Sequence, residues 1–192
     1  RSTQGRSSAA SDVYKRQILA RAMGVPIGRI VLATNANHVL PDYFDGGEYA
    51  PQPSVATIAN AMDVGAPSNF ERLRWLYRSD DAALRAAFAS ASVDDDAIRL
   101  VIARRYRHFG EVFCPHTATA VKVLEDLRNQ GEGGDWAVAA TAHPAKFESV
   151  VEPLVGPVGV PPALADLLLR PAHAEPIDPA YQALVGHVLA GA

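Results

Sequence analysis

The stretch Trp136-Ala-Val-Ala-Ala-Thr-Ala-His-Pro-Ala-Lys-Phe147 decides the fold class of this sequence. Its first part, Trp136–Thr141, is a short apolar run without polar alternation, which is typical of a strand covered on both faces. The chain then turns at Pro144, a residue that suits the first position of a helix, and a helix is expected up to Val155. A buried strand that leads directly into a helix predicts an α/β fold with a parallel sheet.

A second covered strand is expected at Arg29–Ala33, and Thr34–Pro53 is expected to be a loop with one short helical turn. Further helices are expected at Ile18–Gly24, Ser68–Arg78, Asp80–Ser90, Asp94–Gly110, His116–Asn129, Pro162–Leu169 and Pro179–Ala190. Ser68 and Glu71 have the spacing of a capping box. Two strands cannot form a covered sheet alone, so the predicted class is α/β with an incomplete parallel sheet and covering helices.

Composition excludes several functional classes. The 192 residues are 48% apolar and 20% charged with a net charge of -3, so no basic surface for nucleic acid or an anionic membrane is expected. No apolar run approaches the about 20 residues of a membrane span. The single cysteine fits a reducing compartment, so a cytoplasmic location is expected. The spacing of the histidines around Cys114 matches no zinc pattern, and no metal is expected.

Residues 1–17 differ in composition from the rest of the chain. They are rich in serine and arginine with little to bury, and Asp12–Gln17 can be back-translated into a sequence that resembles a transposon end used in sequencing adapters. We therefore expect an adapter-derived segment or a disordered tail, and residues 18–192 as the folded portion. The helix expected at Ile18 begins without a preceding methionine, which suggests the later part of a longer protein.

Ligands in open α/β sheets bind where the parallel strands end, at their carboxyl ends. Thr141 ends the second predicted strand and is a candidate for that crevice, although it fits a helix cap equally well. Asn35, after the first strand, is a second candidate, with a turn residue as the alternative. Ser68, Asn69 and Arg72 at a predicted helix start suit a phosphate or carboxylate, with a capping box beside a surface arginine as the alternative.

Four segments carry a resemblance to a known family: IVLATNANHVLPDYFDGGEY, TIANAMDVGAPSNFERL, PHTATA and TAHPAKFESVV. In this order and at these separations, they resemble the C-terminal part of threonine synthases, which are fold-type II enzymes that use pyridoxal 5'-phosphate. The resemblance implies that the full-length protein converts O-phospho-L-homoserine and water into L-threonine and phosphate. It also places Thr141 beside the pyridine nitrogen of the cofactor, where a hydroxyl moderates the electron sink.

The same resemblance places the Schiff-base lysine and the phosphate loop in the N-terminal half of the family, outside this chain. No catalytic residue is therefore assigned here: Lys122 has the spacing of a helix ion pair, and Lys146 belongs to the HPAKF turn. The chain alone is expected to be inactive. Two alternatives remain, a non-catalytic threonine-synthase-like protein and another fold-type II lyase of the threonine dehydratase or cysteine synthase type. The oligomeric state is left open.

Overall fold

The computed structural model describes residues 16–140, 142–171, 176–178 and 180–190. The chain divides into two compact units, Arg1–Val158 and Gly159–Ala192. Residues 16–22 are helical, so the last two residues of the segment expected to be foreign belong to the first helix, whereas residues 1–15 lie outside the described part. Among the helices that the structure describes, none is long and apolar enough to span a membrane.

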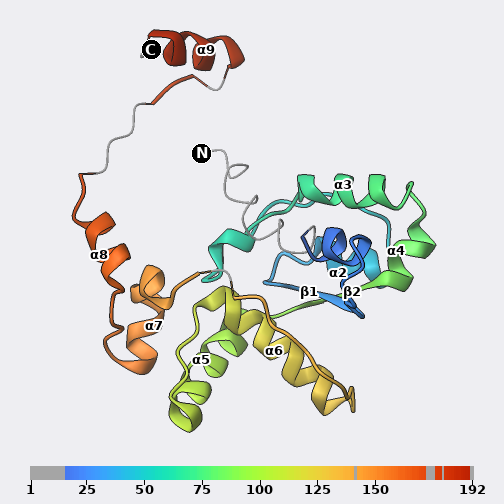
Figure 1. The fold of residues 1–192 in the computed structure, drawn as a ribbon, viewed down its shortest axis with the longest axis horizontal. Coiled ribbons are helices and arrows are strands. Elements are labelled where there is room, and N and C mark those ends of the chain that lie inside the picture. The colour runs from blue at the N-terminus through green and yellow to red at the C-terminus, as the bar shows by residue number, and fades with distance from the viewer. Residues whose placement is uncertain (1–15, 141, 172–175, 179, 191–192) are drawn as a thin grey trace. The chain divides into compact units, whose positions relative to one another are not determined.

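The first unit is built on two parallel strands, β1 (Ile30–Thr34) and β2 (Phe88–Ser92), in register from Ile30 opposite Phe88 (Figure 1). The parallel sheet is as predicted, and β1 lies one residue from its expected position. The second strand is a correction, because it comes from residues expected to continue a helix to Ser90. Alanine-rich composition favours a helix there, but pairing with β1 overrides that local preference.

The predicted strand Trp136–Thr141 is not found: residues 136–140 have no regular secondary structure, and Thr141 lies outside the described residues. A strand exists only through hydrogen bonds to a neighbouring strand, and the described sheet contains β1 and β2 alone. The apolar pattern of this stretch is therefore present without the pairing that would make it a strand.

The alternation of side chains along β1 divides the first unit into two cores, one on each face of the sheet. Ile30 and Leu32 point into the first core, whereas Val31 and Ala33 pack against the second. The first core comprises Ile18, Ile30, Leu32, Leu40, Tyr43, Phe70, Leu73, Leu84 and Phe88. The second comprises Ala59, Val93, Ile98, Val101, Ile102, Ala118, Val121, Val123 and Val151. Helices thus cover both faces of the strands, as predicted.

The helices of the first core are α2 (Val39–Phe44), α3 (Ser68–Leu76) and α4 (Asp81–Ala87), and they lie on one side of the sheet in Figure 1. Those of the second are α5 (Asp95–Phe109), α6 (Pro115–Asn129) and α7 (Glu148–Val155), with short 3₁₀ turns η2 (Asn60–Met62) and η3 (Pro144–Phe147). The second unit contains α8 (Pro162–Leu168) and α9 (Tyr181–Ala190). Apart from the end of α4, these helices occur where the sequence predicts them.

Both ends of α5 follow local chemistry, whereas the start of α3 does not. Asp94 caps α5 through its carboxylate and Gly110 ends that helix at a positive φ of 69°, as the sequence pattern predicts. The capping box at Ser68 is wrong, because Pro67 occupies the N-cap and no side chain caps α3. Ser68 is instead the first helical residue, one position too late for its hydroxyl to serve as the cap.

Candidate functional site

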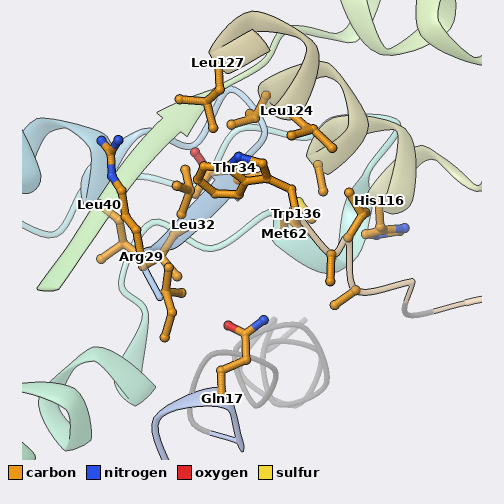
Figure 2. Close-up of a pocket in the computed structure, with 18 of the residues that line it drawn as sticks. Gln17, Arg29, Leu32, Thr34, Leu40, Met62, His116, Leu124, Leu127 and Trp136 are labelled. Atoms are coloured by element: carbon orange, nitrogen blue, oxygen red, sulfur yellow. The ribbon is translucent and has the colours of Figure 1, made fainter. Parts of the chain in front are cut away.

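A cleft of about 720 Å³ runs along β1 in the first unit. One wall consists of β1 residues from both cores, and another consists of α6 together with residues 133–139. Figure 2 shows Leu32 and Thr34 of β1, Leu124 and Leu127 of α6, and Trp136 around this hollow. Most of the lining is apolar. Three of its polar groups, Thr34, Asn37 and His116, come from the carboxyl end of β1 and the start of α6.

The end of β1 leads into a buried network of polar side chains. Asn35 has no exposed surface, and its amide nitrogen donates to Thr57 Oγ1 and to Asp63 Oδ1, each at 2.7 Å. Its carbonyl oxygen accepts from the side-chain nitrogen of Asn37 at 2.9 Å. Asn37 in turn bonds both the backbone carbonyl and the backbone N–H of Val55. The amides thus fix the chain around residues 55–63 against the end of the strand.

His116 lies at the start of α6 and is only 3% exposed. Its Nε2 accepts a hydrogen bond from the backbone N–H of Ala61 at 3.0 Å, so the proton of the neutral ring sits on Nδ1. Nδ1 is buried and finds no hydrogen-bond partner in the part of the chain that the structure describes. Burial lowers the pKa of His116, Lys146 acts in the same direction, and Asp63 opposes both. The ring packs against Phe147 with centroids 4.8 Å apart.

The remaining predicted site residues do not gather at the cleft. Ser68 and Arg72 are exposed on α3 and Asn69 is buried there, but none of the three lines the cleft. Asn35 does not line it either, because the network encloses its side chain. Thr141 lies outside the described residues, although Ala139 just before it lines the cleft. Within the described ranges, no three His, Cys, Asp or Glu side chains are grouped as metal ligands.

Similarity to known proteins bears on the family. The family model for "Threonine synthase, C-terminal" matches residues 117–188. Threonine synthase of Escherichia coli K12 is 35% identical over 164 residues, covering 84% of this chain and 37% of that relative. Threonine synthase of Serratia marcescens is 37% identical over 149 residues, covering 77% of this chain and 34% of that relative. The chain is therefore similar to the C-terminal part of threonine synthases.

Solved threonine synthases share the fold. The crystal structure of the Escherichia coli enzyme matches with a TM-score of 0.76 and 32% identity over 91% of this chain and 40% of that chain. The pyridoxal-phosphate-bound threonine synthase of Brucella melitensis matches with a TM-score of 0.69 and 29% identity over 81% of this chain and 38% of that chain. The chain thus spans 34–40% of the length of these threonine synthases.

The sequence does not mark two residues of this region, Asp63 and His116, as site candidates. Asp63 holds the amide network together, and His116 lines the cleft while its Nδ1 is buried without a partner among the described residues. Both lie within segments that carry the family resemblance, TIANAMD and PHTATA. The resemblance marks the two segments but not these side chains. The contact between the segments joins Ala61 and His116, which are 55 positions apart in the sequence.

Replacing Asn35 tests the amide network. Asn35→Asp puts an acceptor where the amide now donates to the Asp63 carboxylate at 2.7 Å, so we expect a loss of about 3 kcal/mol in the free energy of unfolding at neutral pH. Urea unfolding measures the loss. The double variant Asn35→Asp/Asp63→Asn restores a donor–acceptor pair and should recover part of it. A single variant as stable as the parent would contradict the network.

Replacing His116 tests its neutral state. A folded-state pKa below the ordinary 6.5 means that the unfolded chain takes up a proton first, so stability falls as pH falls below about 6.5. His116→Gln keeps an acceptor for Ala61 and should make the free energy of unfolding less sensitive to acid between about pH 7.5 and pH 5.5. Urea unfolding at both pH values checks this, with the exposed His143→Gln as control. Equal acid sensitivity in the parent and the His116 variant would contradict the assignment.

Proposed function

We propose that this chain is the C-terminal part of a pyridoxal-phosphate-dependent threonine synthase. In that proposal the whole protein converts O-phospho-L-homoserine and water into L-threonine and phosphate. The observation that carries it is the likeness to the Escherichia coli threonine synthase, at a TM-score of 0.76 over 91% of this chain. We further propose that the protein acts in the cytoplasm, since its one cysteine is a free, buried side chain at the start of α6.

The lysines of this chain do not fit the role of holding the cofactor covalently. The Lys122 ammonium contacts the Asp126 carboxylate at 2.6 Å within α6, so it is held in an ion pair. Lys146 lies in η3 and is exposed to solvent. The family resemblance places the covalent attachment of pyridoxal phosphate in the part of a threonine synthase that this chain does not span.

Thr141 is our proposed cofactor-binding residue. When bound, pyridoxal phosphate supplies the electron sink, and a threonine hydroxyl can donate a hydrogen bond to its ring nitrogen without protonating it. The support comes from the family resemblance of TAHPAKF and from the position of the residue two places after Ala139, which lines the cleft together with Val138.

Ser68, Asn69 and Arg72 are our proposed contacts for the phosphate of the substrate. Pro67 is the N-cap of α3, and no side chain caps this helix. A helix start with a hydroxyl, an amide and a guanidinium favours a phosphate. For Asn35 we propose a positioning role, because its buried amide fixes the chain around Asp63.

Covalent labelling tests whether any lysine of this chain holds pyridoxal phosphate covalently. The chain incubated with pyridoxal phosphate and reduced with borohydride should carry no stoichiometric label on one lysine, as measured by peptide mass spectrometry. The reason is the ion pair of Lys122 and the exposure of Lys146. Lys146→Arg provides the background for nonspecific labelling. A single full label on Lys146 that disappears in this variant would refute the proposal.

A chimera tests the activity and Thr141 together. Residues 18–192 replace the matching part of the Escherichia coli threonine synthase, and the product should form threonine from O-phospho-L-homoserine. Thr141→Val should lower kcat about tenfold, the equivalent of one lost hydrogen bond, and shift the absorbance of the cofactor. Thr141→Ser should keep both.

The chimera also separates the alternatives. A folded chimera that binds cofactor without turnover would favour the non-catalytic alternative. If Thr141→Val left kcat and the absorbance unchanged but reduced stability, Thr141 would be only a helix cap.

A further inference from the structure

His116 contacts two short turns that lie far from it in the sequence. It is the second residue of α6, and its Nε2 accepts a hydrogen bond from the backbone N–H of Ala61 in η2 at 3.0 Å. Its ring packs against Phe147, the last residue of η3, with the ring centroids 4.8 Å apart. One buried side chain thus links η2, η3 and the start of α6.

Both turns bear on the cleft along β1. Ala61 and Met62 of η2 line the cleft together with His116, and Figure 2 shows Met62 and His116 at the same hollow. The turn η3 begins at Pro144, three residues after Thr141 in the sequence. A shift of η2 would therefore move the cleft wall, and a shift of η3 would move the chain next to the proposed cofactor contact.

The turn η2 cannot satisfy the Ala61 N–H by itself. The N–H groups in the first turn of a helix have no acceptor within that helix. Within η2, the N–H of Met62 donates to the carbonyl of Ala59 at 2.9 Å. His116 supplies from α6 the acceptor that the preceding N–H lacks. The hydrogen bond from Ala61 therefore ties η2 to α6.

This hydrogen bond sets the geometry of the turns more than it stabilises them. Accepting at Nε2 puts the ring proton of His116 on Nδ1, which is buried and has no partner within the described ranges. One donor is satisfied while another is left unpaired, so the net contribution to the free energy of unfolding is small. The carboxylate of Asp63 is already engaged by Thr57 and Asn35, each at 2.7 Å. A buried histidine kept at such a balance is expected where local geometry serves function.

We propose that His116 is a positioning residue for the cofactor site of a threonine synthase. By accepting from Ala61 and packing on Phe147, it fixes η2 relative to η3, and with them the cleft wall and the chain that follows Thr141. It acts through these turns and not by contact with the cofactor. The inference rests on the proposed function, in which Thr141 binds pyridoxal phosphate.

The contact itself can be tested in the chain as it stands. Long-range proton–nitrogen NMR should place the ring proton of His116 on Nδ1. The amide of Ala61 should exchange faster in His116→Phe, which keeps a ring beside Phe147 but has no acceptor. His116→Gln keeps an acceptor and should retain the exchange rate of the parent. A ring proton on Nε2, or an unchanged rate in His116→Phe, would overturn the proposal.

The chimera with the Escherichia coli threonine synthase tests the effect on the cofactor site. His116→Phe should weaken the binding of pyridoxal phosphate about tenfold, the equivalent of one hydrogen bond, and shift the absorbance of the bound cofactor. His116→Gln should bind within about twofold of the parent and keep its absorbance. Titration of the cofactor-free chimera measures both, at a temperature at which every variant is folded. His116→Leu, which also lacks an acceptor, replaces His116→Phe if the larger ring prevents folding.

A core variant separates positioning from a general loss of stability. Ile98 belongs to the second core and does not line the cleft. Ile98→Val should lower the free energy of unfolding and leave the affinity for the cofactor and its absorbance unchanged. If Ile98→Val weakened binding as much as His116→Phe, the effect of His116 would be one of stability alone and the proposal would be wrong.

The remaining outcomes distinguish this inference from the proposed function. A parent chimera that binds pyridoxal phosphate beside a His116→Phe variant that binds it equally well would refute the positioning role only. If His116→Gln bound as weakly as His116→Phe, the imidazole would act on the cofactor directly and positioning through Ala61 would be wrong. A parent chimera that binds no cofactor would refute the proposed function, and with it the inference that rests on it.

Discussion

The parallel pairing of β1 with β2 is the constraint on which the rest of the first unit depends. Its register places Ile30 opposite Phe88, and both side chains enter the first core. The alternate residues Val31 and Ala33 face the second core, so the period of two along one strand sorts the helices into two layers. A shift by one residue would exchange the faces and move Ile30 and Leu32 into the core that now packs against Val31 and Ala33.

The carboxyl end of β1 then determines where polar groups can be buried. Asn35 follows the strand directly, and its side chain fixes Thr57 and Asp63 from a segment more than twenty residues later. That segment also brings the Ala61 N–H to His116 at the start of α6. A buried polar network is stable only when its members are satisfied; here Asn37 donates to Asn35, and Asn35 donates to Asp63. The buried Nδ1 of His116, without a partner in the described part of the chain, is the exception among these side chains.

Local chemistry made most of the helices predictable from sequence. Asp94 and Gly110 mark the two ends of α5 because capping and the left-handed conformation depend on single residues. The two strand errors have a different cause. Phe88–Ser92 is alanine- and serine-rich and becomes a strand only through β1, whereas Trp136–Thr141 has strand composition but no strand beside it in the described part. Pairing is a property of two segments, and one sequence window contains only one of them.

The candidate site was harder to predict for the same reason. Asn35 is a candidate because it follows a strand, but the role of its side chain depends on its hydrogen bond to Asp63. The orientation of the His116 ring likewise depends on the hydrogen bond from the Ala61 N–H. The resemblance to threonine synthases identified the segments, and only the folded chain brought these side chains together. Thr141, which the resemblance places at the cofactor, is outside the described residues, so its role stays a prediction.

Each of the two units has apolar side chains that its own described elements leave uncovered. Besides the cleft along β1, helix α9 of the second unit buries none of its described residues and exposes Leu184, Val188 and Leu189. A helix on a protein surface normally keeps one polar face towards water, and a mainly apolar helix is normally buried against another surface. The family model extends to residue 188 and so includes most of this helix. Leu184 and Val188 thus lie within the region that matches the threonine synthase model.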